Sequence, residues 1–148
     1  MDSAQDVFAA LPPQRGEIAE LGRAACRAVL SPAAPGGWSP AWRHAVAARI
    51  CTLHGQKGLA SARLAGTDEE TRILADPGFA GRDPRERTVL AFADGVAAAP
   101  RQVTAGDVEA LKSAGVAEAD IVRLCELAAY LAYECRVAAG LSLMREAR

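Results

Sequence analysis

Signals that start and end helices recur along the whole chain, whereas no stretch of useful length shows the alternation of a β-strand. Ser39 precedes a proline at the first helical position, and Asp83 repeats this arrangement before a second apolar run. Thr104 and Asp107 cap a third run. Because the apolar residues between these signals recur at helical spacing, the sequence predicts an all-α fold, a bundle of about six helices.

The apolar segments are joined by short connections. The last of them is the most apolar, and we expect it to be the central helix, with both of its sides partly covered. Helical segments are expected at about residues 7–11, 16–30, 40–66, 67–75, 83–96, 104–115 and 118–144.

The third of these segments is expected to be one long helix that ends at a left-handed Gly66. Gly55 and Gly58 lie inside it, and each costs about 1 kcal/mol of helix propensity relative to alanine. Two interpretations remain open: close packing against another helix, or a site that needs a local adjustment of the backbone. A capping box of Thr67 and Glu70 is expected to start the next, short helix.

A single domain over residues 1–148 is the simplest organisation, since no repeat or low-complexity linker divides the chain. Hydrophobic residues make up 51% of it and charged residues 24%, with a net charge of -1. Such a composition fits neither a disordered chain nor a polybasic nucleic-acid surface. The start of the chain is acidic, and no apolar run approaches the length of a membrane span. We therefore expect a cytoplasmic protein with no nucleic-acid or membrane partner.

The cysteines and histidines predict neither a disulfide scaffold nor a metal site. No two cysteines form a C-x-x-C pair and their spacing is irregular, so free thiols are expected. The two histidines, His44 and His54, have no carboxylate pattern around them that would build a zinc site. We expect no metal and no cofactor. The cysteines are Cys26, Cys51, Cys125 and Cys135.

Part of the chain resembles a known family. Residues 43–63, RHAVAARICTLHGQKGLASAR, resemble the active-site helix of the alkyl hydroperoxidase D and carboxymuconolactone decarboxylase-like proteins. Residues 86–94, 103–108 and 114–121 resemble the closing helices of the peroxidase-related branch of that family. The resemblance covers about residues 38–141. It implies an AhpD-like helical domain that assembles into a homo-oligomer, a trimer or a hexamer, through its helices.

Family members with thiol peroxidase activity carry a glutamate, a C-x-x-C pair twelve residues later, and a histidine four residues after the second cysteine. One thiolate attacks the peroxide, the other thiol resolves the sulfenate, and the glutamate and histidine relay the proton. The matching positions in this chain are His44, Gln56, Leu59 and Arg63. All four are changed, and the sequence does not place any two of the cysteines as a replacement pair. We therefore expect that the peroxidase activity typical of the family is absent.

Three polar residues project within a narrow arc of the expected long helix: Arg49, Gln56 and Arg63, spaced at i, i+7 and i+14. Two guanidinium groups and an amide could hold a carboxylate or a lactone through charge-assisted hydrogen bonds. Alternatively, they form salt bridges with a neighbouring subunit or belong to a solvated face.

The two histidines each have two interpretations. His44 could act as a base in place of the family's glutamate, or it is a polar residue in the first turns of a helix. His54 lies near Cys51 and could lower the pKa of that thiol. The alternative, which we prefer, is that Cys51 is a small buried hydrophobe in an alanine-rich helix.

Two classes of function follow. The first is a non-catalytic binding or assembly module that keeps the family scaffold, self-associates, and works beside an active relative. The second is a non-redox enzyme, a lyase or an isomerase, in which Arg49 and Arg63 anchor a small carboxylated substrate and a histidine moves protons. A thiol peroxidase that uses cysteines outside the family motif is a third alternative. A pocket near Gln56 that contains both arginines and a histidine would favour the enzyme.

Overall fold

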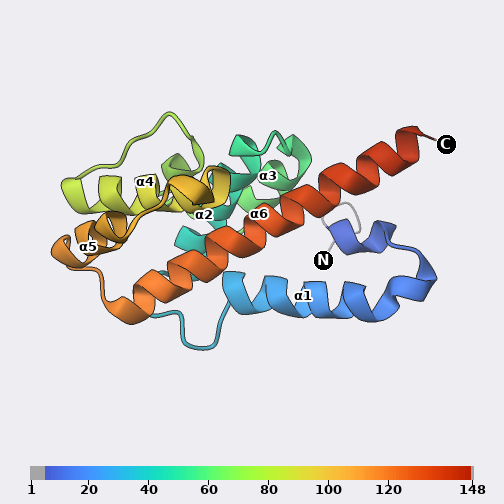
Figure 1. The fold of residues 1–148 in the computed structure, drawn as a ribbon, viewed down its shortest axis with the longest axis horizontal. Helices are drawn as coiled ribbons and strands as arrows, with labels where there is room; N and C mark the ends of the chain where they lie inside the picture. Colours follow the sequence, from blue (N-terminus) through green and yellow to red (C-terminus); the bar gives the residue numbers. More distant parts are fainter. Residues whose placement is uncertain (1–5, 148) are drawn as a thin grey trace.

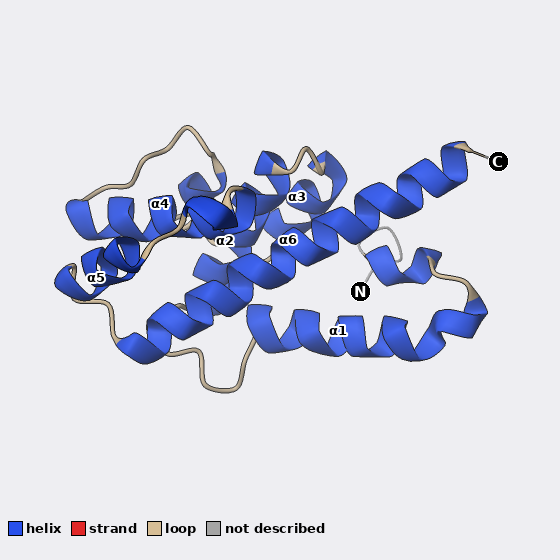
Figure 2. Ribbon diagram, viewed as in Figure 1, coloured by secondary structure: helices blue, strands red, loops and turns tan. Residues whose placement is uncertain are grey.

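The computed structural model describes residues 6–147, and every regular element in that range is a helix (Figure 2). The prediction of an all-α fold with about six helices is confirmed. The acidic start of the chain falls largely on residues 1–5, which lie outside the described residues. The α-helices of the described range are α1 (Gly16–Leu30), α2 (Pro40–Leu53), α3 (Lys57–Leu64), α4 (Pro84–Ala98), α5 (Ala105–Ser113) and α6 (Glu118–Glu146). Short 3-10 helices, η2 to η5, lie at Val7–Ala10, Pro13–Arg15, Arg72–Ala75 and Pro100–Gln102.

Three of the predicted helix starts carry the expected caps. The Ser39 hydroxyl accepts a hydrogen bond of 3.2 Å from the main-chain amide three residues later, at the start of α2. The Asp83 carboxylate accepts one of 2.8 Å at the start of α4. At the start of α5 the predicted capping box is formed, and the Thr104 amide donates to Asp107 Oδ2 at 2.7 Å. Side-chain oxygens thus satisfy amides that have no carbonyl partner within the helix.

The prediction of one long helix over residues 40–66 is wrong, because the chain forms α2 and α3 with a break at residues 54–56. Gly55 has a φ of 72°, in the left-handed region, and a Cβ atom at this position would meet no atom within 4 Å. Close packing against another helix is therefore wrong for Gly55, whose left-handed backbone instead allows the break between α2 and α3. Gly66 does not adopt the expected left-handed conformation, and α3 ends before it, at Leu64.

The capping box predicted for Thr67 and Glu70 is not formed. The Thr67 hydroxyl donates instead to the carbonyl oxygen of Leu64, at 2.7 Å. The carboxylate of Asp68 accepts a hydrogen bond of 2.8 Å from the Thr71 amide. The segment that follows is the short 3-10 helix η4 rather than an α-helix.

Two helices dominate the packing. α6 crosses the whole molecule and contacts α1, α2, α4 and α5, as Figure 1 shows. We expected α6 to be the central helix, but α2 is buried more completely: every residue from 45 to 51 is at most 3% exposed. α2 packs against α1, α3, α4 and α6. Neither α6 nor any other helix of residues 6–147 is long and apolar enough to cross a bilayer.

Two buried arginines of α2 hold connecting segments against the core. Arg43 donates to three carbonyl oxygens in and beside the connection between α1 and α2, at 2.7–2.9 Å. Arg49 donates to both carboxylate oxygens of Asp94 on α4, at 2.8 and 2.7 Å, and to the carbonyl oxygens of residues 76, 77 and 79. Since a buried charge is costly unless its hydrogen bonds are made, these arginines fix the path of the chain around α2.

Candidate functional site

A buried ion pair joins α3 to α6. Nη2 of Arg63 lies 2.7 Å from both Oε1 and Oε2 of Glu134, and the two residues are 6% and 2% exposed. Burial lowers the pKa of Arg63, but the adjacent carboxylate outweighs that effect and raises it overall, so the guanidinium stays charged. Removing two charges from water costs several kcal/mol per ion, on the order of what a good geometry returns. Because buried charges of this kind cluster at functional sites, the pair identifies this part of the interior as a candidate site.

Two thiols lie in contact beside this ion pair. Cys51 on α2 and Cys135 on α6 are 84 residues apart in sequence, yet their Sγ atoms are 3.7 Å apart. They are 0% and 1% exposed. Their contact lowers the pKa of Cys135, because its thiolate would accept the S–H of Cys51. The same contact, together with burial, raises the pKa of Cys51, because a second thiolate would face the first. The pair thus loses one proton far more readily than two.

Tyr130 and Cys26 complete this polar interior. The Tyr130 hydroxyl lies 3.3 Å from Oε1 of Glu134 and 3.2 Å from the carbonyl oxygen of Gly22. Burial, and then the carboxylate, raise the pKa of Tyr130. Burial also raises the pKa of Cys26, which neighbours Arg63 and Tyr130. Both groups are protonated at neutral pH. The buried cluster is the set Cys26, Cys51, Arg63, Tyr130, Glu134 and Cys135.

His44 lies next to the buried cluster with an unsatisfied ring nitrogen. In the described residues, its Nδ1 and the Nε of Arg63 are the buried side-chain nitrogens that have no hydrogen-bond partner. The ring packs against Gly66, where it leaves no space for a side chain. Burial, and then the charge of Arg63, lower the pKa of His44. The imidazole is therefore neutral at pH 7, but it faces packed protein rather than a substrate space.

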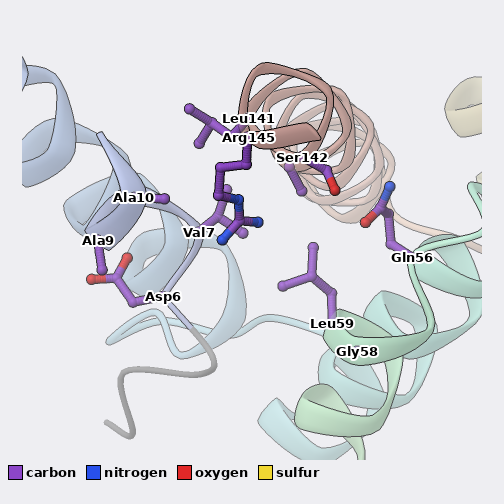
Figure 3. Close-up of a pocket in the computed structure, with 11 residues that line it drawn as sticks. Asp6, Val7, Ala9, Ala10, Gln56, Gly58, Leu59, Leu141, Ser142 and Arg145 are labelled. Atoms are coloured by element: carbon purple, nitrogen blue, oxygen red, sulfur yellow. The ribbon is translucent and has the colours of Figure 1, made fainter. Parts of the chain in front are cut away.

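A pocket of about 500 Å³ lies at the start of α3, between η2 and the C-terminal end of α6 (Figure 3). Gln56 is the N-cap residue of α3, and both Gln56 and Leu59 line this pocket. Leu59 points from α3 into the space, and Arg145 reaches into it from α6. A helix N-terminus is an environment that lowers the pKa of a thiol. Gln56 and Leu59, the two positions that the resemblance equates with cysteines, thus lie together where a thiolate would be stabilised, but neither carries sulfur.

The arrangement expected for Arg49, Gln56 and Arg63 depended on one continuous helix, and the break at Gly55 removes it. The pocket near Gln56 contains neither arginine. Each guanidinium is instead engaged inside the protein, that of Arg49 by Asp94 and main-chain carbonyls and that of Arg63 by a glutamate. Arg49 and Arg63 thus form ion pairs within the protein.

Neither histidine lines the pocket. Nε2 of His54 lies 3.2 Å from the carbonyl oxygen of Ala97, so this ring is engaged with the main chain of α4. Cys51 is fully buried, as expected for a small apolar residue, and its sulfur contacts Cys135 rather than His54.

Sequence reasoning missed Glu134 and the thiol contact. A signal for the first was present: Leu131, Glu134, Cys135 and Ala138 share one face of a helix, and that face is otherwise apolar. A carboxylate on a buried stripe requires a partner, and a buried cation is the usual one. No comparable signal pairs Cys51 with Cys135, because they belong to different helices.

The chain has no match among the known proteins with which it was compared. No family model matches it, and neither the curated proteins nor the solved structures contain a match.

Proposed function

We propose that the chain is an alkyl hydroperoxidase D-like, carboxymuconolactone decarboxylase-like protein that has lost the dithiol peroxidase centre and serves as a self-associating, non-catalytic module. One observation carries this proposal: the residues that line the pocket at the start of α3 include Gln56 and Leu59 and no cysteine. Peroxide reduction by this chemistry requires a thiolate that attacks and a thiol that resolves. An amide and an aliphatic branch supply neither.

Self-association is supported by the C-terminal end of α6, which continues past α3 in Figure 1. Leu143 and Met144 are 66% and 60% exposed there. Large apolar side chains that are this exposed are commonly covered by another surface, so a second copy of the chain is the occupant that we propose, in a trimer or a hexamer. The other apolar or small residues of this part of α6, which also carries Arg136, Ser142, Arg145 and Glu146, are Val137, Ala138, Ala139, Gly140 and Leu141.

The loss of the peroxidase centre is tested by restoring it. The double variant Gln56→Cys/Leu59→Cys places two thiols at the start of α3, where the helix dipole favours the thiolate. We expect the variant to turn over a hydroperoxide in the presence of a dithiol reductant, and alkylation of its thiols to abolish that turnover. Gln56→Ser/Leu59→Ser is the matched control without sulfur. Multiple turnovers by the unmodified protein would contradict the proposal.

Self-association is tested by sedimentation at micromolar concentration. We expect a trimer or a hexamer, and we expect Met144→Glu to dissociate it, because a buried unpaired carboxylate is costly. Val122→Glu is the matched control, since Val122 is 58% exposed in the N-terminal half of the same helix. A strict monomer, or equal dissociation by both variants, would contradict assembly through the end of α6.

A further inference from the structure

The contact between Cys51 and Cys135 has no role in the function proposed above. Of the four cysteines, these two are the pair whose sulfur atoms touch in the described structure. A disulfide bond requires about 2.05 Å between the sulfur atoms, so the observed 3.7 Å must shorten by about 1.7 Å. Their helices, α2 and α6, pack directly against each other, so the approach does not require distant segments to meet.

The surroundings of the two sulfur atoms suit oxidation. Burial and the carboxylate of Glu134 disfavour a thiolate on either cysteine, and the guanidinium of Arg63 offsets them only in part. For Cys135 the contact itself outweighs these effects and lowers the pKa, because the S–H of Cys51 can donate to its thiolate. Cys26 and Cys125 have no sulfur contact of this kind in the described residues, and burial raises the pKa of each of these thiols. The two contacting cysteines therefore differ from the other two in geometry, and Cys135 differs from all of them in the direction of its pKa shift.

We propose that Cys51 and Cys135 are a redox-active pair that closes into an intramolecular disulfide when a small hydroperoxide oxidises the protein. One thiolate attacks the distal peroxide oxygen, the O–O bond breaks, and a sulfenic acid and a water or alcohol form. The second thiol then attacks the sulfenic sulfur, the S–O bond breaks, and water leaves with the remaining proton. Two thiols lose two electrons in total, and one hydroperoxide gains them.

The pocket at the start of α3 provides the route. Leu59, which lines the pocket and is 8% exposed, lies one helical turn before Arg63 on α3. Ala138, which also lines the pocket, lies one turn after Cys135 on α6. About one helical turn on each of two helices thus separates the pocket from the buried cluster. A hydrogen peroxide molecule is small enough to pass when the Leu59 side chain moves.

This inference stands apart from the proposed function. A disulfide buried as deeply as these two residues excludes a bulky reductant, so oxidation consumes one equivalent of peroxide and stops. If the unmodified protein shows no multiple turnovers, the proposal of a redox-active pair still stands. If no disulfide forms, the proposal of a non-catalytic assembly module still stands.

Thiol mapping tests the pair directly. The reduced full-length protein is treated with one equivalent of hydrogen peroxide, denatured, alkylated with N-ethylmaleimide and examined by intact mass and peptide mapping. We expect two of four thiols to be protected, a mass loss of two hydrogens before alkylation, and a peptide that joins Cys51 to Cys135. Four alkylated thiols, or a disulfide between any other cysteines, would overturn the proposal. This result on the unmodified protein does not depend on how any variant folds.

Variants of the pair provide a second measurement. Cys51→Ala and Cys135→Ala are expected to abolish the protected pair, whereas Cys125→Ala, which lies outside the buried cluster, is expected to leave it unchanged. Protection that survives in Cys51→Ala or Cys135→Ala, or that is lost in Cys125→Ala, would overturn the assignment.

The route is tested by the rate of disulfide formation. Leu59→Ala is expected to accelerate it, because the truncation opens the pocket toward the buried cluster. Leu111→Ala is the matched control: it removes a fully buried leucine from α5, a helix that contributes no residue to the lining of the pocket. Equal rates in Leu59→Ala and in Leu111→Ala would overturn entry past Leu59.

Discussion

Breaking the ion pair between Arg63 and Glu134 from one side should cost far more stability than replacing both residues together. Arg63→Met leaves a glutamate that is 2% exposed, with the Tyr130 hydroxyl at 3.3 Å as its remaining partner. Removing one partner of a buried pair costs about 3–5 kcal/mol, because the other charge stays buried without compensation. Glu134→Leu is expected to cost a similar amount, since it leaves the guanidinium alone.

These energies translate into large shifts in melting temperature. At about 2.1 cal/mol/K per residue, a chain of 148 residues has an unfolding entropy of about 0.31 kcal/mol/K. A loss of about 3–5 kcal/mol therefore lowers Tm by about 10–16 °C. The double variant Arg63→Met/Glu134→Leu replaces both charges by apolar side chains and is expected to lie close to the unmodified protein, because such replacements are neutral or stabilising.

Urea denaturation and thermal unfolding at pH 7 measure the four proteins as a double-mutant cycle. Arg82→Met is the control, because it breaks the exposed pair with Glu86 and should cost less than about 1 kcal/mol. Single variants as mild as this control would refute the reasoning. A double variant that loses the sum of the two single losses would refute it as well, because the charges would then not compensate each other.

Three further predictions concern other parts of the fold. Gly55→Ala should lower the free energy of unfolding by about 1–2 kcal/mol, because alanine disfavours the left-handed φ of this position. Gly58→Ala should raise the free energy of unfolding by about 0.5–1 kcal/mol, since α3 leaves open space there. Urea denaturation that shows the same sign for both variants would contradict the role of Gly55. Burial lowers the pKa of His44 in the folded state, so the unfolded chain binds the extra proton, and stability is lost as pH falls through about 6.5. His44→Gln should flatten the stability profile between about pH 7 and 5, and an unchanged slope would argue against a buried neutral ring. Asp94→Asn should lower the free energy of unfolding by about 1.5–3 kcal/mol and speed amide hydrogen exchange near residues 76–79, because Arg49 loses its charged partner. Unchanged exchange there would show that Arg49 does not hold this segment.

The helix starts could be predicted from the sequence because a cap is a local interaction. Ser39 and Asp83 each accept a hydrogen bond from an amide three residues later, and Asp107 accepts one from the Thr104 amide, so no distant part of the chain is needed. The same locality explains the error over residues 40–66. The sequence shows that two glycines lower the helix propensity of this segment. Whether the helix continues or breaks at Gly55, however, depends on where α3 packs.

The candidate site divides in the same way. The residue types at Gln56 and Leu59 follow from the sequence, and so does the lack of sulfur at those positions. Arg63 and Glu134 are 71 residues apart, and Cys51 and Cys135 are 84 apart. Both contacts exist only because α2, α3 and α6 cross at one place in the folded protein.

By itself, then, this sequence determined that the fold is helical, where α2, α4 and α5 begin, and which reactive side chains are missing at the start of α3. The tertiary structure decided which faces meet, and with them the thiol contact, the buried ion pair and the internal partners of the arginines. The physical reason is that side-chain periodicity is set by the 3.6-residue turn of each helix. The pairing of helices depends instead on how the side chains of different helices interlock, which becomes defined only when the whole chain has folded.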